Sequence, residues 1–376
     1  MKTVLIIFGT RPEAIKLAPV ILHMRRHSDI RPVVCFTGQH EPEMVDPIFE
    51  IFSIQPDEHL SVIEPGQSLA GLTKALIDQL APVFERIRPS GVLVQGDTTS
   101  CLVGALVAFY NQIPIGHVEA GLRTNNLDAP FPEEGNRQLV SRLATLHFAP
   151  TLRSAKALYQ ENISKDSVSI TGNTVIDALF EVVRRNESNR INALAKIWPD
   201  RRHERPYVLA TMHRREVFGE MIRGMLGALS DIAAQHSDID VVLTSHPNPN
   251  VQGAIEDILP EAPSSLKVIP PQPYNLFVDL MKRARLILSD SGGVQEEAPS
   301  LDRPVLVLRS QTEREEGVEA GCLVQVGTDR KKIVEKCKRL LTDGDTYRKI
   351  ALAPNPYGDG KAALRISKAF EEYVMK

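Results

Sequence analysis

The feature that most constrains this chain is the alternation of short apolar runs with longer amphipathic segments. The apolar runs are continuous stretches of Val, Ile and Leu, which is typical of strands covered on both faces. The segments between them have helical periodicity, as in residues 14–26, 69–87, 100–110 and 331–341. This order predicts an α/β fold with parallel sheets and helices on both sides. The predicted strands are residues 3–8, 32–36, 91–94, 114–118, 146–148, 168–171, 207–211, 240–244, 266–269, 286–289, 304–308 and 323–326.

The length of 376 residues predicts two domains, because single cores usually split above roughly 250–300 residues. The series of strands pauses between Thr174 and Pro206, where we expect one long helix over 176–198 and then a charged run, 200–206. A solvated linker explains that run better than a nucleic-acid patch. We therefore place the boundary near residue 172, with Rossmann-like domains over 1–172 and 173–360 and a last helix over 362–375.

Composition excludes several classes of protein. The net charge of −3 gives no reason to expect nucleic acid or a membrane surface as partner. The four cysteines are far apart and form no CxxC pair, which argues against a zinc site and against a disulfide framework. The apolar run near the N-terminus is too short for a signal peptide or a membrane span. We expect a cytoplasmic protein without metal or cofactor.

Polar residues and glycines follow most of the predicted strands. In doubly wound sheets, ligands bind outside the carboxyl ends of the strands. Two domains that both carry polar residues there predict a central cleft faced by two parallel sheets. The segments are Gly9-Thr10-Arg11-Pro12, Thr37-Gly38-Gln39-His40, Gly96-Asp97-Thr98-Thr99, Glu119-Ala120-Gly121, Met212-His213-Arg214-Arg215, Ser245-His246-Pro247, Pro271-Gln272-Pro273 and Asp290-Ser291-Gly292-Gly293.

The segment Ser291-Gly292-Gly293 joins a predicted strand directly to a predicted helix. A helix that begins at two glycines presents unpaired N–H groups to an anion, and phosphate is the most plausible one. Glu296 or Glu297, one turn further on, is suited to the hydroxyls of a ribose. The alternative is that Ser291 is an ordinary helix cap and that both glutamates are solvated.

Arg11 and Lys16 form a second candidate for anion binding. Pro12 favours a helix start at this point, which places Arg11 at the start and Lys16 about one turn further on. Two cations at the edge of a cleft suit a diphosphate. A surface pair with no ligand is the alternative.

Carboxylates are the candidates for chemistry. Asp97 and Glu119 each follow a predicted buried strand, and Glu133 and Glu134 follow Phe131-Pro132 at a predicted helix start. Three acids around one ligand can divide the roles of base, acid and electrostatic stabiliser. For Glu134, capping of the helix is an equal alternative. His213, followed by two arginines, is a further candidate, although a lone histidine is often only a packed residue.

Several long motifs, in order from Lys2 to about Gly360, resemble those of the bacterial non-hydrolysing UDP-N-acetylglucosamine 2-epimerases. The motifs are Phe8-Gly9-Thr10-Arg11-Pro12-Glu13-Ala14-Ile15-Lys16, Gly96-Asp97-Thr98-Thr99, Gly116-His117-Val118-Glu119-Ala120-Gly121-Leu122-Arg123-Thr124, Phe131-Pro132-Glu133-Glu134, Ile170-Thr171-Gly172-Asn173-Thr174-Val175-Ile176-Asp177 and Asp290-Ser291-Gly292-Gly293-Val294-Gln295-Glu296-Glu297.

This resemblance implies a GT-B-like fold in which the last helix, 361–376, joins the first domain and the second domain binds UDP. It implies reversible conversion of UDP-GlcNAc to UDP-ManNAc through a 2-acetamidoglucal, and a homodimer. Asp97, Glu119 and Glu133 would be the acid–base group, and His213 would steady the leaving diphosphate. The other implied contacts are Arg11, Lys16 and Ser291-Gly292-Gly293 to phosphates, Gln272 and Phe277 to uracil, Glu297 to ribose, and Arg314 to the nucleotide.

Two departures from the family pattern stand out. Glu315 follows Arg314 where the family often has proline, and the segment from Gln39 to Met44 carries an extra residue. Some members bind a second UDP-GlcNAc beside that segment, so the resemblance does not extend to such a site here. The alternatives are a UDP-sugar glycosyltransferase of the same fold, a hydrolysing epimerase that releases free ManNAc, and a UDP-sugar-binding regulatory protein without turnover.

Overall fold

The computed structural model describes residues 2–201, 205–212, 220–245, 248–258 and 261–376. Contacts divide the chain into two compact units: unit 1 is Met1–Glu181 with Tyr357–Lys376, and unit 2 is Val182–Pro356. The boundary predicted near residue 172 lies in the loop before helix α7, Thr174–Ser188, whereas the contacts divide the chain within that helix. No helix among the described residues is both long enough and apolar enough to cross a bilayer.

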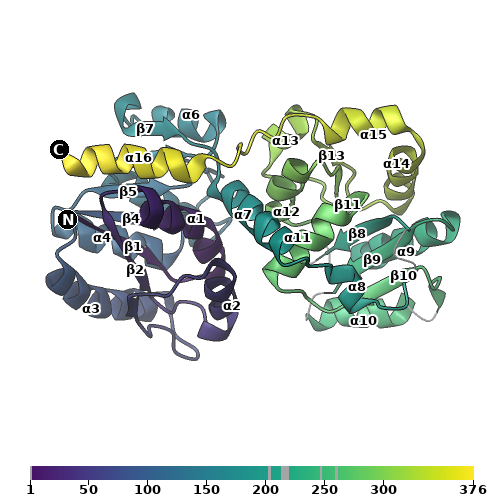
Figure 1. The fold of residues 1–376 in the computed structure, drawn as a ribbon, viewed down its shortest axis with the longest axis horizontal. Helices are drawn as coiled ribbons and strands as arrows, with labels where there is room; N and C mark the ends of the chain where they lie inside the picture. The colour runs from purple at the N-terminus through teal and green to yellow at the C-terminus, as the bar shows by residue number, and fades with distance from the viewer. Residues whose placement is uncertain (1, 202–204, 213–219, 246–247, 259–260) are drawn as a thin grey trace. The chain divides into compact units, whose positions relative to one another are not determined.

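Unit 1 is built on a seven-stranded parallel sheet in the order β3-β2-β1-β4-β5-β6-β7 (Figure 1). Its strands are β1 Thr3–Phe8, β2 Arg31–Phe36, β3 Glu58–His59, β4 Gly91–Gln95, β5 Ile115–Val118, β6 Leu146–Ala149 and β7 Val168–Ile170. Its helices are α1 Arg11–His27, α2 Pro42–Phe52, α3 Leu69–Ile87, α4 Thr99–Tyr110, α5 Glu133–Leu143, α6 Leu152–Gln160, the 3-10 turn Lys165–Ser167, α7 and α16 Ala362–Met375.

Unit 2 has a six-stranded parallel sheet in the order β10-β9-β8-β11-β12-β13. Its strands are β8 Tyr207–Thr211, β9 Asp240–Thr244, β10 Leu266–Ile269, β11 Leu286–Ser289, β12 Val305–Val307 and β13 Leu323–Gln325. Its helices are α8 Ala193–Ile197, α9 Glu220–Gln235, α10 Pro249–Ile258, α11 Tyr274–Arg283, α12 Gly292–Glu297, the 3-10 turn η4 Ala298–Leu301, α13 Glu315–Glu319, α14 Arg330–Thr342 and α15 Gly344–Ala351.

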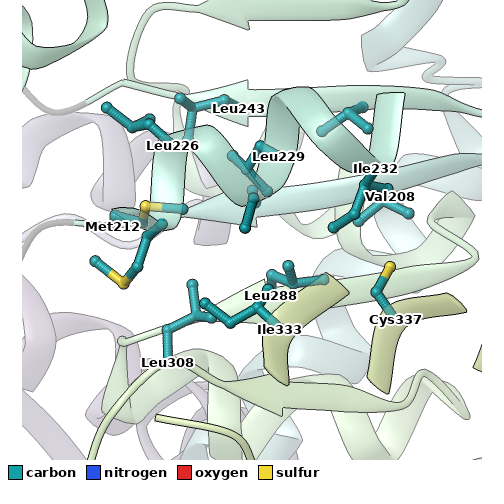
Figure 2. Packing of buried hydrophobic residues seen from close by; sticks show 14 of the residues in the cluster. Val208, Met212, Leu226, Leu229, Ile232, Leu243, Leu288, Leu308, Ile333 and Cys337 are labelled. Carbon is teal, nitrogen blue, oxygen red and sulfur yellow. The ribbon is translucent and has the colours of Figure 1, made fainter. Parts of the chain in front are cut away.

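Alternate residues of the strands form the core of each unit. In unit 2, Val208 and Leu288 point to the face covered by α9 and α14, and Figure 2 shows them packed with Leu229, Ile333 and Cys337. Neighbouring strand residues such as Leu209 and Ile287 are also fully buried. Successive strand residues point to opposite faces of the sheet, and both sets are buried. This confirms the prediction from the continuous apolar runs that both faces of the sheets are covered.

The strand order places one switch point in each unit. In unit 1 the chain runs outward from β1 through β2 to β3, then returns to β4 on the other side of β1. In unit 2 the corresponding neighbours are β8 and β11. Loops that leave neighbouring strands in opposite directions open a crevice at their carboxyl ends, where doubly wound sheets bind ligands. The loops that begin at Gly9 and Gly96 flank this point in unit 1, and the loop that begins at Asp290 borders it in unit 2.

The fold corrects one predicted helix and adds a strand. The single helix expected over 176–198 is wrong, because α7 ends at Ser188 and α8 begins only at Ala193. Ile191 donates its N–H to the carbonyl of Asn186, and Arg190 adopts a left-handed φ of 51°, so the helix closes in a Schellman motif. The added strand, β3, spans only two residues, too few for an apolar pattern to reveal it.

Candidate functional site

Two of the predicted acids lie at the carboxyl edge of the unit 1 sheet. Asp97 comes two residues after β4, and Glu119 comes directly after β5. The two strands are parallel neighbours with Gln95 opposite Val118, so the residues that follow them are adjacent. The third acid, Glu133, begins α5, and Asn136 of the same helix donates to the backbone oxygen of Asp97 at 2.8 Å. Neighbouring strands and one helix start thus bring the acidic segments together.

Glu119 has an unusual backbone conformation. Its φ is 63°, in the left-handed region that glycine and asparagine tolerate better than glutamate. Its side chain is buried, with 7% exposure, and both carboxylate oxygens lie 2.6 Å from Nζ of Lys16. Gln95 and Asn173 also donate to it. Backbone strain at a fully hydrogen-bonded buried acid is a mark of a functional position.

Lys16 and Arg11 occupy different environments, although the sequence analysis paired them. Lys16 is bound to Glu119 and therefore lies with the acids. Arg11 begins α1, and within the described chain its guanidinium has no ion-pair partner. Its backbone N–H donates to Nδ1 of His40 at 3.3 Å, which holds the start of the helix. Of the two, Arg11 is the cation available to an anionic ligand.

Asp97 is held by Arg137, a residue that the sequence analysis did not single out. Nε and Nη2 of Arg137 lie 2.8 and 2.7 Å from the Asp97 carboxylate. Burial raises the pKa of Asp97, and the charge of Glu119 raises it further, while Arg137 opposes both. A perturbed pKa of this kind is typical of carboxyl groups at catalytic sites.

The two adjacent glutamates of α5 have different surroundings. Glu134 is fully buried and accepts hydrogen bonds from the N–H groups of Thr124 and Asn125, at 3.0 and 3.2 Å. Burial alone would raise the pKa of Glu134, but these bonds, with those from Gln138 and Arg137, lower it. Glu134 therefore holds the preceding loop. Glu133 is half-buried, and its carboxylate has no partner within the described residues.

The segment Ser291-Gly292-Gly293 joins strand β11 to helix α12, as the sequence predicts. Ser291 is the N-cap residue of α12, which begins at Gly292, but its side chain makes no capping hydrogen bond. Glu296 and Glu297 are 4% and 5% exposed. The alternative of an ordinary serine cap followed by solvated glutamates is therefore wrong. The reason is that Arg314 donates to Glu296 at 2.8 Å and the hydroxyl of Tyr274 donates to Glu297.

Arg314 explains the need for one of the two glycines. A Cβ atom at Gly292 would lie 3.2 Å from Cζ and Nη2 of the Arg314 guanidinium. The arginine thus packs directly against the backbone of Gly292, and Glu296 and Glu313 accept its hydrogen bonds. This arrangement places a cation beside the start of α12.

The residues expected near uracil belong to α11 and the turn before it. Gln272 donates to the backbone oxygen of Pro270 at 2.7 Å, and Phe277 lies in the first turn of the helix. Tyr274, on the same turn, joins this segment to Glu297 of α12. Tyr274 was not among the residues expected from the sequence, although it lies three positions before Phe277 and shares a helical face with it. Tyr274 thus links the helix expected to contact uracil to Glu297, which is expected to contact the ribose.

One predicted site residue, His213, lies outside the described residues, as do Arg214, Arg215 and His246. In the part of the chain that the structure describes, no group of three or more His, Cys, Asp or Glu side chains is arranged to hold a metal ion.

Comparison with known proteins identifies the family. Residues 22–371 match the sequence model of the family described as UDP-N-acetylglucosamine 2-epimerase. The chain belongs to the UDP-N-acetylglucosamine 2-epimerase family. The UDP-N-acetylglucosamine 2-epimerase of Escherichia coli (strain K12) is 47% identical, over 98% of this chain and 98% of that protein. A probable UDP-N-acetylglucosamine 2-epimerase of Ralstonia nicotianae is 46% identical, over 99% of this chain and all of the relative.

A solved structure of the same family has the same fold. The UDP-GlcNAc 2-epimerase of Neisseria meningitidis, bound to UDP-GlcNAc, superimposes with a TM-score of 0.88 at 43% identity, covering 99% of this chain and 100% of that one. The expected GT-B-like class, with two parallel-sheet units, is confirmed. Membership of the UDP-N-acetylglucosamine 2-epimerase family also confirms that the chain is an enzyme of the isomerase class.

Proposed function

We propose that this protein interconverts UDP-N-acetylglucosamine and UDP-N-acetylmannosamine by inversion at C2, without hydrolysis, and supplies ManNAc-type sugars for cell-surface polysaccharides. The observation that carries the proposal is the pair of acids formed by the partly buried Asp97 and the buried Glu119, held by Arg137 and Lys16 at the carboxyl edge of the unit 1 sheet. The names of relatives that align along their whole length support the substrate. So does the UDP-GlcNAc bound to the Neisseria meningitidis enzyme.

The chemistry explains why both acids and a diphosphate site are needed. The proton on C2 is not adjacent to a carbonyl group and is only weakly acidic. Its removal becomes feasible when the C1–O bond breaks at the same time, so that positive charge develops on the sugar ring. A carboxylate takes the proton, UDP leaves with the bonding electron pair, and C1 and C2 become a double bond. The intermediate is a 2-acetamidoglucal.

The second half of the reaction reverses these steps, except that the proton reaches C2 from the opposite face while the C1–O bond re-forms on its original face. A carboxylic acid delivers a proton to C2, and an oxygen of the UDP β-phosphate re-forms the bond to C1. We assign the proton transfers to Asp97, Glu119 and Glu133. Burial raises the pKa of Asp97, which favours its protonated form and so its use as a proton donor. Lys16 holds the Glu119 carboxylate in position.

The remaining roles concern the nucleotide. We assign the diphosphate to Arg11, which has no ion-pair partner among the described residues, and to Ser291, Gly292 and Gly293. Arg314 adds a cation beside Gly292. Gln272 and Phe277 take the uracil, Glu297 takes the ribose, and His213 steadies the leaving diphosphate. The homodimer and the cytoplasmic location are also proposals, and light scattering of the purified protein tests the dimer.

Incubation with UDP-GlcNAc in D2O tests the proposed reaction. Because the C2 proton exchanges with solvent in the glucal pathway, both epimers should gain deuterium at C2 while total UDP-sugar is conserved. Nuclear magnetic resonance of the sugar protons follows the label. Turnover that retains hydrogen at C2 would contradict the mechanism. Free ManNAc as the main product would indicate the hydrolysing reaction, and turnover that begins only when an acceptor is added would indicate a glycosyltransferase.

A further inference from the structure

Glu13 is a buried acid that the proposed mechanism does not use. It is 1% exposed, at the third position of α1, and no cation pairs with it within the described chain. A buried carboxylate without a counter-ion costs stability unless hydrogen bonds satisfy it. Burial raises the pKa of Glu13 to about 7, even though hydrogen bonds from Thr10, Thr98 and the turn backbone lower it. Packing alone therefore does not explain why a carboxylate occupies this buried position.

The hydrogen bonds of Glu13 cross the switch point of the unit 1 sheet. Oε2 accepts from the N–H groups of Gly9 and Thr10, at 3.1 and 2.8 Å, and from the Thr10 hydroxyl at 2.7 Å. Oε1 accepts from the hydroxyl of Thr98 at 2.7 Å. Gly9 and Thr10 follow β1, whereas Thr98 follows β4, its neighbour in the sheet. One carboxylate therefore joins the two loops that leave the sheet at this point.

Helix capping explains only part of this arrangement. The spacing of Thr10 and Glu13 is that of a capping box, in which a glutamate accepts from the N-cap N–H at the start of its own helix. An exposed glutamate can do that. Here the carboxylate also accepts from Gly9 and reaches Thr98, the N-cap residue of α4. The additional bonds act between elements and not within one helix.

The two joined loops carry groups of the proposed reaction. Arg11 follows Thr10, and Asp97 precedes Thr98. We propose that Glu13 is a positioning residue, which fixes the distance between the diphosphate-binding start of α1 and the proton-transferring Asp97. The inference rests on the proposed function. Because a misplacement of about 1 Å at an active site can cost about a hundredfold in rate, a link of this kind affects turnover more than binding.

Variants at both ends of the link test the proposal. Glu13→Ala removes the carboxylate. Thr98→Val removes the hydroxyl and keeps the shape of the side chain. Each should lower kcat for UDP-GlcNAc about tenfold or more, with little change in KM. Glu13→Gln keeps the acceptor for Gly9 and Thr10, and Thr98→Ser keeps the hydroxyl, so both should retain kcat within about threefold of wild type.

The matched control is Ser68→Ala. Ser68 caps α3 by accepting from the N–H of Gly71, so this variant loses a helix cap as Thr98→Val does, but Ser68 makes no hydrogen bond to Glu13 among those that the structure describes. Turnover of Thr98→Val equal to that of the control would overturn the inference, as would wild-type kcat in Glu13→Ala. If Glu13→Ala does not fold, the comparison of kcat between Thr98→Val and Thr98→Ser tests the inference without it. Absence of turnover in the wild type would instead refute the proposed function.

A measurement without substrate tests the link itself. The groups around it that titrate or carry charge are Arg11 and His40 on one side and Asp97 and Cys101 on the other. In a pH titration, the amide resonances of Gly9 and Thr10 should move together with a midpoint near the Glu13 pKa of about 7. In Glu13→Gln they should not move in this range. Amide shifts that respond equally in both proteins would contradict the assignment.

Discussion

At the scale of single residues, the unit 1 site contains two features that lower stability and that packing does not explain. Glu119 keeps a left-handed backbone where glycine would be less strained. Glu13 is buried, and no cation among the described residues pairs with it. Natural chains keep such features at functional positions at the expense of stability. Glu119 directly follows β5, and Glu13 lies in the first turn of α1, which follows β1. Both therefore lie at the carboxyl edge of the unit 1 sheet, where doubly wound sheets bind ligands.

Asp97→Asn is the sharpest single-residue test of the proposed chemistry. Asparagine keeps the shape and an acceptor for Arg137 but cannot exchange a proton, so epimerisation should fall about a hundredfold or more. The dissociation constant for UDP should change little, because we assign the nucleotide to other residues. Turnover is measured by sugar-proton resonances, and UDP binding by calorimetry.

The control for this substitution is Asp231→Asn. Asp231 forms a two-bond ion pair with Arg330 on the surface of unit 2, so the variant removes a comparable aspartate–arginine pair without touching the acidic site. It should turn over like the wild type. Equal loss of activity in the two variants would mean that the charge of Asp97 matters only for folding.

At the scale of elements, helix ends explain the one long helix that was predicted wrongly. α7 ends in a Schellman motif around Arg190, and the same pattern closes α6 around Asn162, whose φ is 62°. Helices most often signal this ending by a glycine in the left-handed position. Neither helix has a glycine at that position. The amphipathic pattern of α7 therefore runs on into α8 without a sequence signal for the end of α7.

Arg190→Gly should stabilise the protein. Glycine adopts a left-handed φ without the steric penalty of a Cβ atom, although it also raises the entropy of the unfolded chain. The net effect should be an increase of about 0.5–1 kcal/mol in the free energy of unfolding. Arg190 is exposed and has no ion-pair partner within the described residues, so no contact is lost. Denaturation in urea measures the change.

Asn162→Gly is the comparison for that variant. It occupies the same position of the same motif, but asparagine already tolerates the left-handed region, so the gain should be smaller. A larger gain at position 162 than at position 190 would show that backbone strain does not control these helix ends.

At the scale of the whole molecule, the chain returns to unit 1 through its last helix. Phe370 of α16 is fully buried, packs against Phe148, and lies where a Cβ atom at Gly91 or Gly116 would approach it within 3.0 Å. Asp177 of α7 accepts from the N–H groups of Ala362 and Ala363 and so caps the same helix. Unit 1 is therefore completed only when the end of the chain has been made.

Phe370→Ala tests the dependence of unit 1 on its last helix. Loss of a fully buried phenylalanine should lower the free energy of unfolding by about 3–5 kcal/mol. Leu364→Ala, an exposed position of the same helix, should change it by less than about 0.5 kcal/mol. Urea denaturation followed by the circular dichroism of the helices measures both. Similar losses in the two variants would mean that the buried face of α16 contributes no more to stability than its exposed face.

Local pattern determined much of the fold. Continuous apolar runs require burial on both faces, so they predicted the parallel sheets, and the observed strands agree within one or two residues at each end. The starts of two helices could also be predicted, because Pro12 in the first turn of α1 and the two glycines that begin α12 are local signals. The same local signals identified the loops that carry Arg11, Asp97, Glu119, Glu133 and Ser291.

Only the tertiary structure decided which partner each polar group has. Lys16 binds Glu119, which is 103 residues further along the chain; Arg137 binds Asp97, and Arg314 packs on Gly292. No local spacing encodes such pairs, because they depend on the order of strands in the sheet and on where each loop ends. Glu13 shows the physical reason most directly: its link to Thr98 exists only because β1 and β4, distant in sequence, are neighbours in the sheet.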